Sequence, residues 1–161
     1  MAGKTAIVTG GGSGFGAGIA RKFATEGAHV HVVDINAEAA RAIADEVDGT
    51  AITCNIADGQ DVTALANTVL TSGSLDILVN NAGVTHMPSA LEDVSEEDFD
   101  RLYAVNMKAV YLTARAFVPH FKERRAGAIQ NLESNAGLKT RPDEASMITG
   151  VAMEVDGGRC I

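Results

Sequence analysis

The chain has 161 residues, a length that suits one domain with a hydrophobic core. Its 46% hydrophobic and 21% charged residues are typical of a globular protein, and no apolar run is long enough to cross a membrane. A formal net charge of −8 argues against a nucleic acid as partner, and the two cysteines and the lack of a signal-peptide pattern favour the cytoplasm.

The first half of the chain alternates short apolar runs with helical patterns. Strands are predicted at residues 5–9, 30–33, 50–54 and 75–79. A helix is predicted after the first strand, where Ile19, Ala20, Phe23 and Ala24 fall at helical spacing, and further helices are predicted at 37–47 and 58–70. This alternation is typical of a parallel sheet joined by right-handed crossovers.

A predicted loop at residues 84–94 opens the second half. Ser95 and the carboxylates at 96–98 then predict a capped helix start, because a serine oxygen accepts from a free amide and acidic groups favour the positive helix end. An acidic binding patch at 92–100 is the alternative.

This helix is expected to run to about Arg125 and to carry a wide apolar surface. The cations at its end are interpreted as partners of the helix dipole rather than as a phosphate site; they are Lys122, Arg124 and Arg125. Strands are expected at 128–132 and 151–155, and residues 133–150 contain no convincing helix.

A glycine-rich turn, Gly10–Gly16, joins the first strand to the first helix. Such a turn lets the backbone approach a pyrophosphate, which the free amides and the dipole of the helix N-terminus bind. Asp34 ends the second strand, where a carboxylate can bind the adenosine ribose hydroxyls. Because it would repel a 2′-phosphate and neither Ile35 nor Asn36 is cationic, NAD is favoured over NADP. The alternatives are a plain tight turn and a solvated aspartate.

The segment Thr9–Gly16 resembles the T-G-x-x-x-G-x-G turn of the short-chain dehydrogenases/reductases. Asn55–Ile56 stands where that family usually has Asp-Val beside the adenine, and residues 80–83 match its N-N-A-G motif. The resemblance implies this set of cofactor-binding residues: Gly10, Ser13, Gly14, Phe15, Gly16, Asp34, Ile35, Asn55, Ile56, Asn81, Ala82 and Gly83.

Two further matches concern catalysis. Asn106 matches a helix asparagine that helps to anchor a proton-relay water, and Ser134 matches the serine that orients a substrate carbonyl. The resemblance implies an α/β fold, with a Rossmann-like, doubly wound parallel sheet in three layers. We expect a single NAD(P)-binding domain over residues 1–161, with a near-complete core at 1–134 and a C-terminal strand segment at 143–161.

The chain departs from the family after Ser134. A Tyr-x-x-x-Lys motif, whose tyrosine is the acid/base of the reaction, should follow near Met147. The only tyrosines, Tyr103 and Tyr111, lie earlier, and neither is followed by lysine four residues on. We interpret the passage from Pro142 to Asp143 as an internal deletion that leaves the C-terminal half of the fold incomplete.

The resulting hypothesis is an NAD-dependent oxidoreductase of CH–OH groups, with hydride transfer between NAD(H) and a small alcohol or carbonyl substrate. Because the tyrosine and lysine are absent, we expect little turnover from the chain as written. The alternatives are a dinucleotide-binding module without catalysis and a self-associating fragment whose uncovered helix binds a partner or a second copy. A homo-oligomer is expected.

No metal is expected. His29 and His31 are taken to point to opposite faces of their strand, which would exclude a simple metal pair, and no histidine–carboxylate cluster is present. His86 is interpreted as a solvated loop residue, with a substrate-facing role as the alternative.

Overall fold

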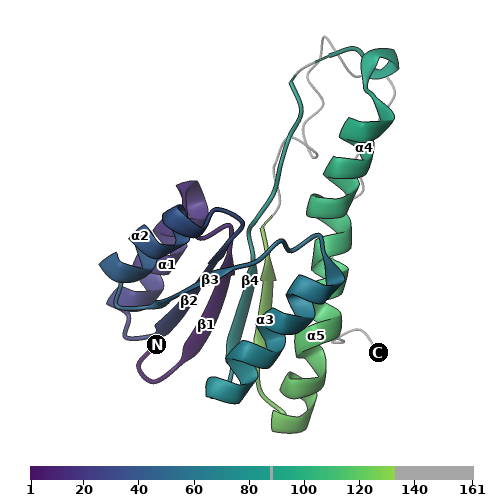
Figure 1. Cartoon of the computed structure of the whole chain (residues 1–161). Coiled ribbons are helices and arrows are strands. Elements are labelled where there is room, and N and C mark those ends of the chain that lie inside the picture. Colours follow the sequence, from purple (N-terminus) through teal and green to yellow (C-terminus); the bar gives the residue numbers. More distant parts are fainter. Residues whose placement is uncertain (88, 133–161) are drawn as a thin grey trace, which may run out of the picture. The chain divides into compact units, whose positions relative to one another are not determined.

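The computed structural model describes residues 1–87 and 89–132. Five parallel strands form one sheet in the order β3-β2-β1-β4-β5 (Figure 1). The strands are β1 (Thr5–Thr9), β2 (His29–Asp34), β3 (Thr50–Thr53), β4 (Ile77–Asn80) and β5 (Ala128–Asn131). The predicted α/β class with a doubly wound parallel sheet is confirmed.

Helices cover both faces of this sheet, which confirms the three-layer prediction. Figure 1 shows α1 and α2 on one face and α3 and α5 on the other. The helices are α1 (Gly14–Thr25), α2 (Ala37–Glu46), α3 (Gly59–Ser72), α4 (Glu96–Tyr103) and α5 (Ala109–Arg124). None of the helices in the described ranges is both long and apolar enough to cross a membrane.

Residues Met1–Asn131 form one compact unit. The second unit, Leu132–Ile161, lies outside the described residues except for Leu132. The predicted strand at 151–155, the domain bounds and the incomplete C-terminal half therefore stay predictions.

The main core lies between the sheet and the layer formed by α3 and α5. Apolar side chains from both layers are almost fully buried there, among them Ile7, Leu78, Leu65, Val69 and Phe117. Burying one such side chain contributes about 1.5–3 kcal/mol, so this layer positions the carboxyl ends of the central strands firmly.

The helix predicted at 95–125 begins as expected but is not a regular α-helix. The Ser95 hydroxyl accepts a hydrogen bond from the Asp98 N–H at 3.1 Å, which confirms the predicted cap. A π-helical turn, Ala104–Lys108, separates α4 from α5. In the described residues of the predicted loop before it, 84–87 and 89–94, the structure has a 3₁₀ turn, Leu91–Asp93.

Asp76 is a buried ionic junction just before β4. Its carboxylate accepts hydrogen bonds from the Thr5 N–H, the Lys4 ammonium and the Arg124 guanidinium. Burial raises the pKa of Asp76, but these donors outweigh burial and hold the pKa below its ordinary value. Arg124 also donates to the Leu75 carbonyl, so its role at the end of α5 is structural, as predicted.

The expectation that His29 and His31 point to opposite faces is wrong. Residues two apart in a strand share a face, and the two rings meet edge to face with centroids 5.0 Å apart. His29 bonds the Thr50 hydroxyl of β3. His31 is buried, and its Nδ1 has no hydrogen-bond partner among the described residues.

His31 should make stability depend on pH. Burial, assisted by His29, lowers the pKa of His31 from its ordinary 6.5 to about 4. The folded state therefore holds His31 neutral while the unfolded state takes up a proton below pH 6.5. His31 should therefore leave the free energy of unfolding unaffected above about pH 6.5 and should lower it progressively as the pH drops towards 4.

Urea denaturation at several pH values between about 4 and 6.5 measures how steeply the free energy of unfolding depends on pH. His31→Phe, which keeps a ring but cannot titrate, should flatten it, and the matched variant His86→Gln, in an exposed loop, should not. A slope that survives in His31→Phe would assign it to another group.

Candidate functional site

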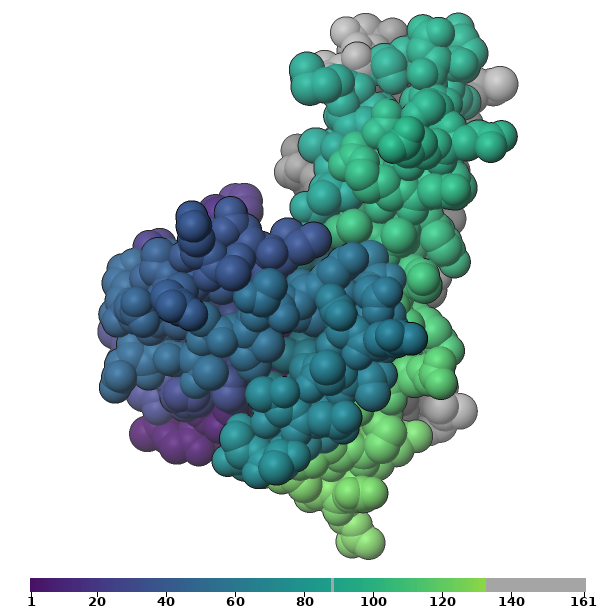
Figure 2. Space-filling view, in the orientation of Figure 1, coloured from purple at the N-terminus to yellow at the C-terminus, as the bar shows by residue number. Residues whose placement is uncertain are grey.

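A cavity of about 420 Å³ opens at the carboxyl ends of β1, β2 and β4. The chain leaves β1 towards β2 and returns through α3 to β4 on the other side of β1, so the strand order reverses here. Open α/β sheets bind ligands at such a switch point. Figure 2 shows the surface hollowed between the first helices and the helix that begins with α4.

The N-terminus of α1 borders this cavity with backbone N–H groups that bond none of the other described residues. Its N-cap residue, Ser13, makes no side-chain cap, and the first turn holds no acidic residue. In contrast, the starts of α2, α3 and α4 are capped by Asn36, Asp58 and Ser95. Free amides and the positive end of a helix dipole form a site for an anion such as a phosphate.

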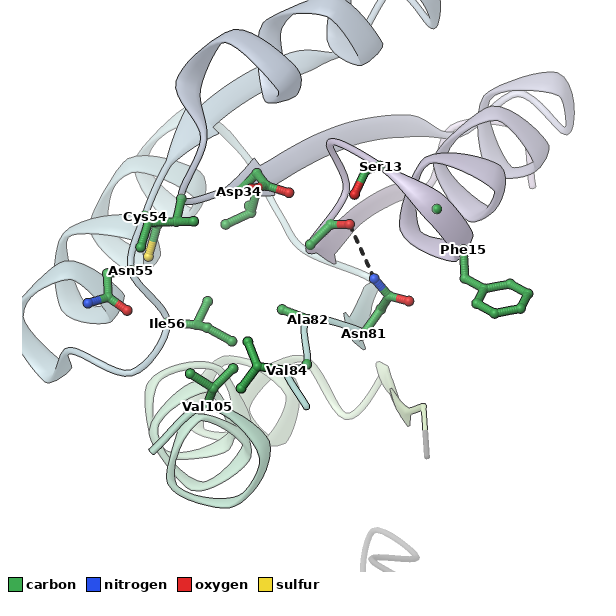
Figure 3. Close-up of a pocket in the computed structure, with 15 residues that line it drawn as sticks. Ser13, Phe15, Asp34, Cys54, Asn55, Ile56, Asn81, Ala82, Val84 and Val105 are labelled. Carbon is green, nitrogen blue, oxygen red and sulfur yellow. Dashed lines mark hydrogen bonds between the residues drawn. The ribbon is translucent and has the colours of Figure 1, made fainter. Parts of the chain in front are cut away.

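Asn81 fixes the glycine-rich turn to the end of β4. Its side-chain Nδ2 donates to the carbonyls of Thr9 and Gly10 at 2.8 and 3.3 Å. The Thr9 hydroxyl accepts from the N–H groups of Asn81 and Ala82 at 3.0 and 3.1 Å. Figure 3 shows one of these bonds beside the cavity. The turn is therefore preorganised.

Gly16 is required by this arrangement. A Cβ on Gly16 would overlap the Gly10 carbonyl oxygen and the Asn81 Nδ2. Gly16 thus lies behind the turn rather than on the cavity wall, and its role is to let α1 pack closely.

The Asp34 carboxylate stands at the end of β2 on the cavity wall. Its Oδ2 accepts from the Gly12 N–H and its Oδ1 accepts from the Asn36 N–H, both at 3.0 Å. A Cβ on Gly12 would lie 2.9 Å from Oδ2, so Gly12 is needed for this approach. Each oxygen keeps a second lone pair for a ligand hydroxyl.

Cys54, Asn55 and Ile56 line the cavity on the same side as Asp34 (Figure 3). The Asn55 Oδ1 accepts from the Ala57 N–H and keeps a second lone pair, so both the Oδ1 and the Nδ2 of Asn55 can bind a ligand. Burial, with the charges of Asp61 and Asp58, raises the pKa of the Cys54 thiol to about 11. This thiol stays neutral near pH 7 and provides a weakly polar wall.

Phe15 lies on the opposite side of the glycine-rich turn from Asp34, as Figure 3 shows, and its side chain is 85% exposed. A ligand that spans the turn would therefore have one end near Asp34 and the other near Phe15.

Asn106 occupies the π-helical turn and binds the loop after β4. Its Oδ1 accepts from the Val84 N–H and its Nδ2 donates to the Val84 carbonyl, both at 2.9 Å. The side chain thus holds the segment that follows the N-N-A-G motif. His86, two residues further on, bonds the neighbouring Met87 carbonyl through Nδ1.

The structure brings the sequence-predicted cofactor residues to one place. Apart from Gly16, all of them line the cavity: Gly10, Ser13, Gly14, Phe15, Asp34, Ile35, Asn55, Ile56, Asn81, Ala82 and Gly83. Ser134 lies outside the described residues.

Sequence reasoning missed Val84 and Val105 on the cavity wall, and also the support that Thr9 and Gly12 give to Asn81 and Asp34. The spacing of the glycines contained a signal for Gly12, but nothing in the sequence indicated Val105. The described ranges contain no group of three or more His, Cys, Asp or Glu side chains suited to a metal ion.

The sequence matches the short chain dehydrogenase family over residues 4–146. It is 41% identical over 140 residues to the D-threitol dehydrogenase of Mycolicibacterium smegmatis, an alignment that covers 83% of this chain and 54% of the relative. The chain spans about half to two thirds of the length of the curated relatives that it matches.

Solved structures resemble the fold closely. The 3-ketoacyl-(acyl-carrier-protein) reductase of Brucella melitensis, complexed with NADH, aligns with a TM-score of 0.85 and 41% identity over 89% of this chain and 62% of that one. A metagenomic short-chain oxidoreductase in complex with NADP aligns with a TM-score of 0.80 and 38% identity over 85% of this chain and 65% of that one.

Two glycines of α1 provide a matched test of the packing behind the turn. Gly16→Ala should destabilise the protein by about 2 kcal/mol, because its Cβ overlaps backbone and forces the turn to shift. Gly18→Ala meets nothing within 4 Å and should stabilise it by up to about 1 kcal/mol through helix propensity. Urea denaturation measures both, and equal effects would contradict the described packing.

Proposed function

The chain belongs to the short-chain dehydrogenase family, and on that premise we propose that its cavity binds NAD(H) for hydride transfer to or from an alcohol or carbonyl substrate. One observation carries the proposal: the uncapped start of α1 and the Asp34 carboxylate border the same cavity. The first suits a diphosphate and the second suits a ribose.

The described residues fit such a dinucleotide. The amides at the start of α1 would hold the pyrophosphate, and Asp34 would accept from the adenosine ribose hydroxyls. Asn55 would offer its Nδ2 to the adenine, with Ile56 and Cys54 as apolar walls. The other half of the molecule would extend past the turn towards Phe15.

NAD rather than NADP is proposed as the preferred cofactor. A 2′-phosphate would be attached to the ribose that Asp34 is proposed to bind, so the Asp34 carboxylate would repel it. Ile35 is 70% exposed beside it and provides no charge to compensate. Similar proteins have been solved with NADH and with NADP, so similarity alone selects neither cofactor. The proposed preference for NAD therefore rests on Asp34.

The bound nicotinamide would supply the hydride donor or acceptor of the reaction. Ser134, by the family resemblance, would hydrogen-bond the substrate oxygen. Asn106 matches the residue that anchors a relay water, but both polar atoms of its side chain already bond Val84, so its side chain is proposed to hold that loop in place. No tyrosine of the chain has lysine four residues later.

The absent acid/base favours a second function for the chain as written, a dinucleotide-binding module with little or no turnover. The substrate is proposed to be a small molecule, since the family acts on alcohols and carbonyls. A homo-oligomer and a cytoplasmic location stay predictions.

Asp34→Ala tests the cofactor proposal. Removing the carboxylate should weaken NADH binding about ten- to a hundredfold, the value of a hydrogen bond to a charged group, and should weaken NADPH binding much less. Titrating the protein while following NADH fluorescence measures both affinities. Asp45→Ala, an exposed aspartate of α2, removes the same charge elsewhere and should leave both unchanged. Folded wild-type protein that binds neither nucleotide would refute the cofactor assignment.

Turnover is tested separately, in samples shown to bind NADH. With a panel of secondary alcohols, NAD reduction should fall about a hundred- to ten-thousandfold below that of a family member with the motif, because no positioned group takes the proton. Sustained turnover that Ser134→Ala abolishes would overturn the expected impairment and would require another acid/base.

A further inference from the structure

His29 and His31 form a pair of imidazoles on β2, which we call the histidine pair. Both lie on the same face of the sheet as Val33, a member of the main core that α3 and α5 cover. His31 is only 6% exposed, whereas His29 is exposed at the start of the strand. One imidazole is thus held by the core, and the other can be reached from solvent.

The two rings have the separation that binding of one metal ion requires. An imidazole nitrogen binds a transition metal at about 2.0–2.1 Å, and the ring centroid lies about 1.1 Å behind that nitrogen. Two imidazoles on one ion therefore have centroids about 4.5 Å apart in square-planar coordination and about 5.2 Å apart in tetrahedral coordination. The centroids of His29 and His31 are 5.0 Å apart.

Each ring has a nitrogen available for such an ion. The Nε2 of His29 bonds the Thr50 hydroxyl at 3.0 Å, which leaves its Nδ1 for a ligand. The Nδ1 of His31 is buried and has no hydrogen-bond partner among the described residues. A buried polar atom without a partner is unusual in a folded protein because it loses its water without compensation. A metal ion would supply the missing partner.

Thr50 provides the support that a metal-binding histidine usually has. Such a histidine donates its second ring N–H to a fixed acceptor, which sets the tautomer and the ring orientation. Thr50 lies opposite His31 on β3, and its hydroxyl can accept from the Nε2–H of His29. A metal also needs a neutral imidazole. Burial, assisted by His29, lowers the pKa of His31 to about 4, so His31 is neutral at pH 7.

We propose that the histidine pair binds a divalent transition-metal ion such as Zn²⁺, with two imidazoles as protein ligands and water completing the coordination. Imidazole suits Zn²⁺, Ni²⁺ and Cu²⁺, whereas Mg²⁺ and Ca²⁺ prefer oxygen ligands. The sequence-based exclusion of a metal pair assumed that the side chains point to opposite faces, and they share one. The site is separate from the cofactor cavity, which lies at the carboxyl end of β2 beside Asp34.

The number of ligands sets the expected strength. The rings now meet edge to face, and rotation of the exposed His29 side chain would turn both nitrogens towards one ion. Two ligands should supply about half the binding free energy of a four-ligand zinc site, which corresponds to a Kd on the order of 10 μM. Cu²⁺ should bind more tightly than Zn²⁺ or Ni²⁺.

Titration of the full chain, without a histidine tag, with Zn²⁺ tests the site. Calorimetry at about pH 7.5 should show one site with a Kd on the order of 10 μM, and Mg²⁺ should give no binding. In ¹⁵N NMR of the imidazoles, Zn²⁺ should shift the signals of His29 and His31 and leave those of His86 and His120 in place. His29→Ala should weaken Zn²⁺ binding at least about tenfold, because a single imidazole cannot chelate.

His86→Gln, which removes an exposed loop histidine, is the matched control and should leave Zn²⁺ affinity unchanged. Adding His31→Phe to His29→Ala should weaken binding little further, since the two ligands act together. Absence of saturable binding up to about 1 mM Zn²⁺, shifts at other histidines instead, or unchanged affinity in His29→Ala would each overturn the proposal. The NMR measurement needs no variant, so it decides the proposal even where a variant folds poorly.

Discussion

The contact between Asn81 and the first turn of the chain is the constraint on which the rest of the site depends. The Asn81 side-chain amide donates hydrogen bonds to the carbonyls of Thr9 and Gly10. The Thr9 hydroxyl in turn accepts hydrogen bonds from the backbone N–H groups of Asn81 and Ala82. These bonds join the ends of β1 and β4, the two strands between which the strand order reverses. The cavity exists because its two walls are fixed there, and the free amides of α1 face it for the same reason.

Most of the fold could be predicted from the sequence because its signals are local. Apolar runs and the Ser95 cap each depend on a few neighbouring residues, and the structure follows them to within a few positions. The π-helical turn was not predicted, and the contact of its Asn106 with Val84 joins residues 22 apart, which no local pattern indicates. The error over His29 and His31 came from misapplying the two-residue period of a strand, not from missing information.

The site was predictable in its members but not in its geometry. Glycine spacing and strand ends indicated which residues gather at one edge of the sheet. The Ala57 N–H that binds the Asn55 oxygen is only two residues away, so that bond is local. Nothing local shows that the Gly12 N–H holds the Asp34 carboxylate, since these residues lie 22 apart and tertiary packing fixes their backbones. Asp76 is similar, because its partners Lys4 and Arg124 are far apart in the chain.

The strand order has a consequence for synthesis. Strands β1 to β4 and the helices between them are complete by Asn80, and the bonds from Asn81 and Ala82 to Thr9 join the end of β4 to the glycine-rich turn two residues later. Because synthesis runs from the N-terminus, these elements leave the ribosome before the long helix that brings Phe117 into the core. Domains generally fold as units, so the first strands and helices must wait for that helix before their core is complete.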